Sequence, residues 1–114
     1  MAKETLIEKY ARENGLVDER RMTIYAEVSC SNGNNGVAYA FLNGSKIHLY
    51  EPIGFTKLGD YIETIDMKEA TDIKSCKIIL FHYIKFKYNG YTYKFSKFAQ
   101  PKKVIAAIEE CCRL

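Results

Sequence analysis

Cysteine and histidine side chains are the first candidates for chemistry in this chain, because they bind metal ions and act as nucleophiles or bases. The candidates are Cys30, Cys76, Cys111, Cys112, His48 and His82. A tetrahedral metal site usually draws on closely spaced pairs such as Cys-x2-Cys or His-x3-His, and the sequence has no such pair. Cys111 and Cys112 are adjacent, which on a helix turns their side chains about 100° apart. We therefore expect no metal site.

Catalytic groups are equally sparse. Cys76 is the one cysteine with a basic setting, because Lys74 and Lys77 flank it, but neighbours along a strand do not make a nucleophile and base pair. Glu63 and Asp66 would lie on opposite faces of a regular strand. No glycine-rich loop opens a helix, as phosphate binding would require. The sequence therefore predicts a protein that is not an enzyme and carries no cofactor.

The strongest charge feature is a run of lysines. From Ile73 to Lys103 there are eight lysines and no Asp or Glu, although the formal net charge of the chain is only +3. Such a local excess can recruit an anionic partner, but lysines on outward strand positions also keep a sheet edge from aggregating. Both interpretations stay open. The residues that we select for anion or partner binding are Lys85, Lys87, Lys94 and Lys97.

The elements that position these lysines can be predicted from the last third of the chain. Two runs of alternating apolar and polar residues flank Asn89-Gly90, which predicts a hairpin with strands at 82–88 and 91–98. After Pro101 the apolar spacing changes to that of a helix, at about 100–112. Lys85, Lys87 and Lys94 then share the outer face of the hairpin. The side chains expected to point inward are Ile84, Phe86, Tyr88, Tyr91, Tyr93 and Phe95.

The preceding chain predicts one more helix and five more strands. The helix covers 3–14, with an apolar stripe of Leu6, Ile7, Tyr10 and Ala11, and a charged linker at 18–21 follows it. The strands are expected at 22–30, 37–43, 46–51, 61–67 and 71–78, with a loose connection at 54–59. The apolar run 78–81 either extends the fifth strand or starts the sixth. A slip by one residue exchanges the two faces, so the side on which His82 lies is left open.

Length and composition indicate a single small domain. The chain has 114 residues, of which 47% are hydrophobic and 27% charged, as is ordinary for a globular protein. We expect an N-terminal helix at 1–17 and a barrel domain at 18–114. No apolar run has the length of a signal peptide or a membrane span, so we predict a cytoplasmic protein with free thiols.

Seven short antiparallel strands followed by one amphipathic helix resemble the pleckstrin-homology (PH) superfold, and most closely its small bacterial PH-like and GRAM-like domains. The likeness covers about 22–112 and rests on the order of the elements and on the hydrophobic pattern. The bacterial domains share a fourth strand like Thr64-Ile65-Asp66-Met67, a short fifth strand with an Ile like Ile73, a lysine- and tyrosine-rich hairpin and a final helix. It implies a mainly β (α+β) fold: a seven-stranded antiparallel split barrel capped by the C-terminal helix. The N-terminal helix lies outside the family pattern.

The resemblance implies a non-catalytic binding module that recognises a protein partner or itself. In this superfold a peptide can lie along the fifth strand beside the final helix. Here that groove would involve Ile73, Lys74, Ser75, Lys102 and Ile105.

The alternative function is weak electrostatic attachment to an acidic membrane surface through the lysine-rich strand face. Lipid-binding relatives carry basic residues between the first two strands, but 29–36 has no Lys or Arg, so the usual phosphoinositide site is not expected. We do not expect nucleic acid as a partner, because the alternation places most aromatic rings on the face opposite the lysines.

Overall fold

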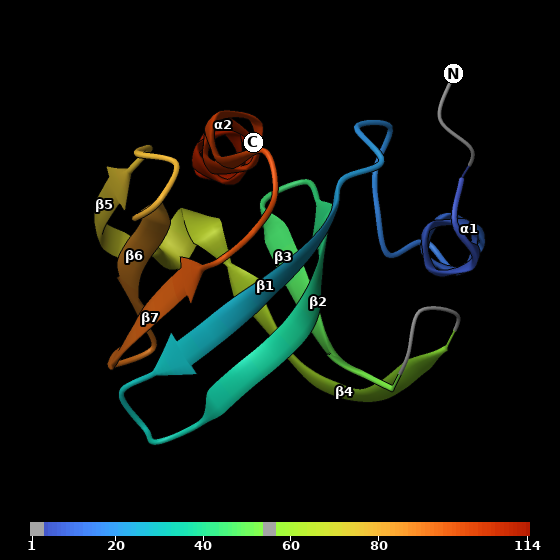
Figure 1. Ribbon diagram of the computed structural model, residues 1–114, viewed down its shortest axis with the longest axis horizontal. Helices are drawn as coiled ribbons and strands as arrows, with labels where there is room; N and C mark the ends of the chain where they lie inside the picture. The colour runs from blue at the N-terminus through green and yellow to red at the C-terminus, as the bar shows by residue number, and fades with distance from the viewer. Residues whose placement is uncertain (1–3, 54–56) are drawn as a thin grey trace.

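The computed structural model describes residues 4–53 and 57–114, and its strands form one curled antiparallel sheet (Figure 1). The elements are α1 (Leu6–Glu13), β1 (Thr23–Cys30), β2 (Asn35–Asn43), β3 (Lys46–Pro52), β4 (Leu58–Asp66), a 3-10 turn (Met67–Glu69), β5 (Thr71–Cys76), β6 (Tyr83–Tyr88), β7 (Tyr91–Ser96) and α2 (Pro101–Cys111). The strand order is β4-β3-β2-β1-β7-β6-β5, so β4 and β5 are the two edges. The predicted fold, seven antiparallel strands capped by a C-terminal helix, is confirmed.

The core lies inside the curl of the sheet, and α2 closes one end of it (Figure 1). The buried stripe of α2 is Val104, Ile105, Ile108 and Cys111, which matches the helical spacing in the sequence. From β6 and β7 the interior receives Ile84, Phe86, Tyr93 and Phe95, as predicted. Tyr88 is half-buried against this core. Tyr91 lies on the same face, opposite Tyr88, but at the start of β7 it is 42% exposed and does not join the core.

The turn at Asn89-Gly90 sets the register of the β6–β7 hairpin. Both residues have positive φ, 53° and 83°, as a type I′ turn requires. Tyr88 therefore pairs with Tyr91, and Lys85 pairs with Lys94 further along the two strands. The hairpin predicted from the Asn-Gly signal is thus present with the expected faces.

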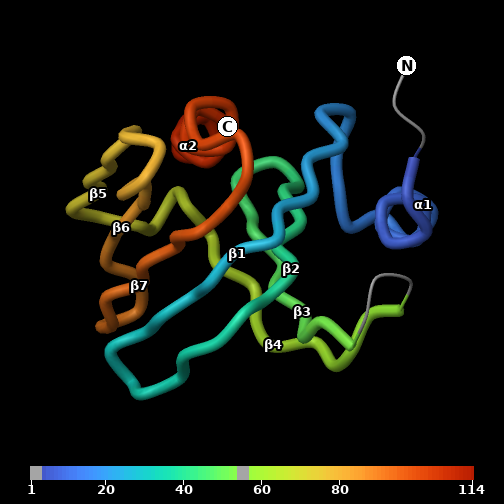
Figure 2. Tube along the Cα trace, in the orientation of Figure 1, coloured from blue at the N-terminus to red at the C-terminus, as the bar shows by residue number. Residues whose placement is uncertain are grey.

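Strand β4 differs from its prediction in length and in one face. It begins at Leu58, so it takes up part of the loose connection predicted at 54–59, of which 54–56 lie outside the described residues. An irregularity in the pairing with β3 leaves Ile62 without an opposite residue, because Leu49 pairs with Glu63 and Tyr50 with Tyr61. This bulge turns Tyr61 outward, and its hydroxyl lies 2.8 Å from Thr64 Oγ1. Beyond β4 the chain passes through the 3-10 turn to β5 (Figure 2).

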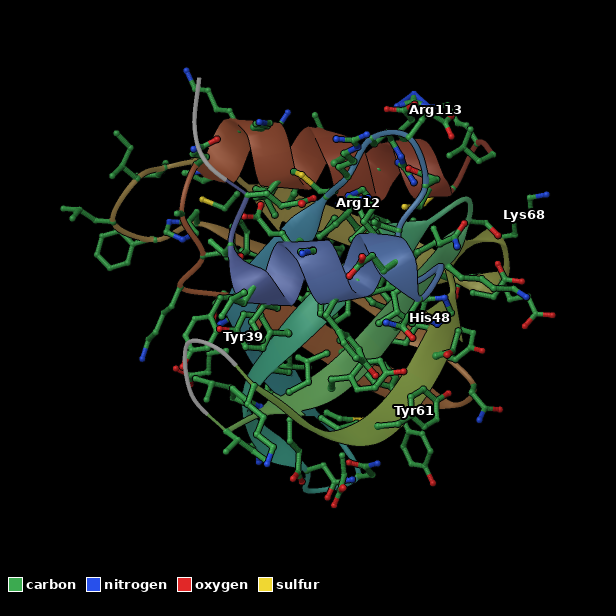
Figure 3. All side chains as sticks on the ribbon, turned by 90° about the vertical axis from the view of Figure 1, so that its right-hand side faces the viewer. Arg12, Tyr39, His48, Tyr61, Lys68 and Arg113 are labelled. Carbon is green, nitrogen blue, oxygen red and sulfur yellow. The ribbon has the colours of Figure 1, made fainter. Side chains whose placement is uncertain are left out.

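Helix α1 packs on the outer face of the sheet, across β2 and β3 (Figure 3). Thr5 and Glu8 form a capping box at its start: Glu8 N–H donates to Thr5 Oγ1 at 3.1 Å, and Thr5 N–H donates to Glu8 Oε1 at 2.9 Å. The buried residues Ile7 and Ala11 join a second small core with Tyr39 and Phe41. The predicted stripe was too wide, because Leu6 and Tyr10 are exposed. α1 covers a sheet face and leaves the edge strand β5 open.

The charged linker at 18–21 also proves to be structural. The Arg20 guanidinium binds the Asp18 carboxylate at 2.8 Å and donates to the carbonyl oxygens of Gly44 at 2.9 Å and Ala107 at 3.3 Å. The backbone N–H of Gly44 donates to Asp18 at 2.7 Å. This pair therefore ties the segment before β1 to the β2–β3 turn and to α2.

Candidate functional site

A row of three lysines crosses the outer face of β5, β6 and β7. The register places Lys74 opposite Lys85, and Lys85 opposite Lys94. All three are exposed, and no ion pair within the described part of the chain includes them. Like charges directly opposite one another destabilise a sheet, so folding alone does not favour this arrangement. We call these three residues the lysine row.

The other two lysines predicted as binding residues, Lys87 and Lys97, form ion pairs. Lys87 contacts Asp72 at 3.3 Å, and Lys97 contacts Glu27 at 2.9 Å. Both are exposed ion pairs, which add little to stability, but they reduce the free positive charge at those positions. The structure therefore brings Lys85 and Lys94 together with Lys74, a residue that the resemblance to the PH superfold assigned to a peptide groove.

Tyr83 lies next to the lysine row on the same outer face. It pairs with Ser96 of β7 and with Cys76 of β5. Each of these three residues is two positions along its strand from a lysine of the row, so it lies on the same face. The Lys94 ammonium lies 5.2 Å from the centre of the Tyr83 ring, within range of a cation–π interaction. The aromatic ring is thus positioned between the row and the connection that precedes β6.

That connection carries four consecutive exposed apolar side chains, which we call the apolar loop. Ile78, Ile79, Leu80 and Phe81 are 62%, 75%, 84% and 72% exposed. This corrects the expectation that 78–81 extends the fifth strand or starts the sixth: β5 ends at Cys76 and β6 starts at Tyr83. A turn closes here, with Phe81 N–H donating to Ile78 O at 3.0 Å.

His82 fixes the apolar loop to the rest of the fold and settles the question of where its side chain lies. The half-buried ring accepts the backbone N–H of Phe98 on Nε2 at 3.0 Å, and its Nδ1 lies 2.7 Å from the carbonyl oxygen of Ile79. A neutral ring protonated on Nδ1 satisfies both contacts. The ring also packs edge-on against Phe98, with 4.7 Å between centroids.

The peptide groove predicted along β5 is only partly available. Ser75 and Lys102 are exposed, and Ile73 is half-buried against the core. Ile105 has no exposed surface, so its place in the groove is corrected: it is a core residue. The pairing of β5 with β6 is irregular between Thr71 and Lys74. Such a bulge weakens an edge as a template for an added strand.

The barrel end at the β1–β2 turn holds a cleft of about 460 Å³. Among the described residues, its lining contains the carboxylates of Glu51 and Glu63 and no Lys or Arg, and 29–36 also has no basic residue. The Tyr93 hydroxyl donates to Glu63 at 2.9 Å. Burial, and then this hydrogen bond, raises the pKa of Tyr93. A cleft of this charge is unsuited to a phosphate group.

The residues considered for catalysis or metal binding are dispersed. The four cysteines are free, and burial raises the pKa of the Cys111 and Cys112 thiols. On β3, the His48 Nδ1 atom lies 2.8 Å from Thr64 Oγ1 of β4. Burial lowers the pKa of His48. Among residues 4–53 and 57–114, no group of three or more His, Cys, Asp or Glu side chains is arranged to hold a metal ion. In the same residues no helix has the length and apolar character needed to cross a membrane.

A solved structure has a fold similar to that of this chain. No protein-family model matches the chain, and no match is found among curated proteins. A similar solved structure is the apo structure of the activated truncation of Vav1, a protein that contains a PH domain. The two share 10% sequence identity at a TM-score of 0.66, and the alignment covers 94% of this chain and 32% of that chain. This chain therefore spans about a third of the length of that one. The likeness concerns the fold, which is PH-like.

Proposed function

We propose that this PH-like chain is a non-catalytic binding module that attaches to anionic membrane surfaces through the lysine row. The observation that carries the proposal is the alignment of Lys74, Lys85 and Lys94 on one exposed face, where no carboxylate of the described residues pairs with them. Each basic residue near an anionic membrane contributes about 1 kcal/mol. Three of them give reversible attachment. A cytoplasmic location and membership of the bacterial GRAM-like group remain predictions from the sequence.

Vesicle sedimentation tests this proposal. We expect binding to phosphatidylcholine vesicles that contain phosphatidylserine, and weaker binding to phosphatidylcholine alone. Binding is expected to weaken between about 0.01 M and 0.15 M salt, because the screening length falls from roughly 30 Å to 8 Å.

The decisive variant is Lys74→Gln/Lys85→Gln/Lys94→Gln. At about 1 kcal/mol per lysine, the vesicle partition coefficient at low salt is expected to fall on the order of 100-fold. The control Lys9→Gln/Lys57→Gln/Lys68→Gln removes the same formal charge from exposed positions outside β5, β6 and β7 and should bind much as the wild type does. An equal loss in both triple variants would show that net charge, and not the lysine row, controls binding, and the proposal would be rejected.

A second candidate function is recognition of a protein partner or a second copy at β5. It is favoured by one observation: β5 is an edge strand, and its residues Lys74 and Ser75 are exposed. Pairing of two copies at this edge would give a concentration-dependent dimer in sedimentation equilibrium. A monomer over the whole concentration range would contradict self-recognition at this edge.

A further inference from the structure

The apolar loop is exposed in a way that the attachment proposed above does not explain. Its four side chains are between 62% and 84% exposed and follow one another directly in the chain. Single apolar residues on a surface are normal, but a run of three or four exposed together is unfavourable unless it has a function. It marks a site where another apolar phase covers the surface.

The loop is held in an outward position. The turn between Ile78 and Phe81 and the contacts of His82 with Ile79 and Phe98 fix both ends of the run. Figures 1 and 3 show the segment between β5 and β6, yellow to orange, beside α2, and in Figure 3 it reaches beyond the body of the molecule. The apolar side chains are therefore presented as a projecting tip, and not as the wall of a groove.

Apolar, aromatic and basic side chains follow one another from the tip of the loop in the same order as the layers of a membrane surface. Tyr83 lies next to the loop on the outer face. The lysine row lies two residues further along the strands, which is a distance of about 7 Å. In a bilayer, apolar side chains enter the acyl boundary, aromatic rings favour the interface and lysines reach the anionic headgroups. An interfacial segment needs to enter only about 5–10 Å.

We infer that the apolar loop inserts into the interfacial layer of an anionic bilayer, with the lysine row on the headgroups. The inference rests on the proposed attachment and adds to it a site of insertion and an orientation. The α2 end of the barrel faces the membrane, and the acidic cleft at the β1–β2 end faces water. A projecting tip beside an exposed row of cations suits a deformable anionic surface. A protein partner would need a matching apolar socket.

The sequence offers a clean probe of insertion, because it contains no tryptophan. Leu80→Trp places a single indole at the most exposed position of the loop. With vesicles of phosphatidylcholine and phosphatidylserine we expect its emission to shift to shorter wavelength and to be quenched by brominated lipids. The control Ile53→Trp, at an exposed position next to β3, should show neither effect.

A pair of double variants measures what insertion contributes. Ile79→Ser/Leu80→Ser removes one Ile and one Leu from the loop, and Leu6→Ser/Ile53→Ser removes the same residue types from exposed positions elsewhere. At about 0.15 M salt, where charge is screened, the loop variant should lose about tenfold in vesicle partitioning while the control stays near wild type. Unchanged thermal unfolding of both variants verifies that each is folded.

The outcomes separate the inference from the function on which it rests. If the wild type binds anionic vesicles at low salt but Leu80→Trp shows no shift and the loop variant binds normally, attachment stands and insertion is wrong. If the wild type binds no vesicles at any salt, both fail. If the Leu80→Trp emission shifts with protein concentration in the absence of lipid, the tip docks on a second copy, and insertion is overturned.

Discussion

At the scale of single residues, Arg20 connects several segments that are distant in the sequence. Its partners Asp18, Gly44 and Ala107 belong to three separate segments, and it also lies 3.7 Å from the Cys111 sulfur. The side chains of Arg20 and Asp18 are only 18% and 13% exposed. Loss of one partner would leave the other charge poorly solvated, which costs more than loss of a surface pair.

Acid unfolding should report this pair. The hydrogen bond from the Arg20 guanidinium is the main cause that lowers the pKa of Asp18 from 3.8 to about 2. Because the folded pKa lies below the unfolded one, the stabilisation is complete above about pH 5 and is lost as the pH falls toward 2. We expect the pair to account for on the order of 1 kcal/mol of this loss, after allowance for partial hydration.

The matched variants are Arg20→Met and Arg21→Met. Arg20→Met should lower the free energy of unfolding at neutral pH by about 2 kcal/mol and flatten its decline between about pH 5 and pH 2. Arg21 is exposed, and its variant should change stability by less than about 0.5 kcal/mol. Urea unfolding across this pH range measures both effects, and the same acid dependence in all three proteins would show that Asp18 does not contribute.

At the scale of elements, α1 covers part of the outer face of the sheet, whereas β5 forms an uncovered edge. α1 buries the outward rings of Tyr39 and Phe41 through Ile7 and Ala11. β5 stays open as an edge but carries Lys74 and a bulge near Asp72, whose φ is 53°. Both features discourage uncontrolled strand addition. The protein thus covers an apolar face and protects a polar edge.

Two truncations on α1 test how firmly it is attached. Ile7→Ala removes a side chain that is 3% exposed, whereas Leu6→Ala removes one that is 59% exposed. We expect Ile7→Ala to lower the free energy of unfolding by about 2–3 kcal/mol through lost burial and a cavity, and Leu6→Ala by less than about 0.5 kcal/mol. Urea unfolding measures both. Equal small effects would mean that α1 is only loosely docked and that 18–114 behaves as the folded unit.

At the scale of the whole molecule, the proposed membrane contact and the acidic cleft lie at opposite ends of the barrel. The segment of the apolar loop lies beside α2, at the other end of the barrel from the β1–β2 turn (Figure 1). The cleft is lined by residues of that turn and of the neighbouring strands. An orientation with the α2 end on the bilayer leaves Glu51 and Glu63 in water, away from the anionic headgroups. The charge distribution therefore favours this orientation over the reverse one.

Hydrogen exchange on vesicles tests that orientation directly. With phosphatidylserine-containing vesicles, amide exchange should slow several-fold over 77–83, which contact the bilayer, and stay unchanged over 31–36 at the β1–β2 turn. Neutral vesicles at the same lipid concentration serve as the control. Protection of 31–36 in place of 77–83 would mean that the opposite end binds, and the assigned orientation would be wrong.

The sequence by itself determined the elements and most of their faces. Alternation around Asn89-Gly90 and helical spacing after Pro101 are local patterns, so they predicted the hairpin, α2 and the core residues Ile84, Phe86, Tyr93 and Phe95. These features follow from neighbouring residues, whose periodicity is fixed by strand and helix geometry.

Only the tertiary structure decided which distant residues meet. Lys74 joins Lys85 and Lys94 because three strands share one register, and Arg20 finds Gly44 and Ala107 across the fold. The run 78–81 was apolar enough for a strand, but with β5 ending at Cys76 and His82 bonded to Phe98 it became an exposed loop. A bulge likewise turned Tyr61 outward. Register, bulges and long-range contacts depend on pairing between segments, which local periodicity does not specify.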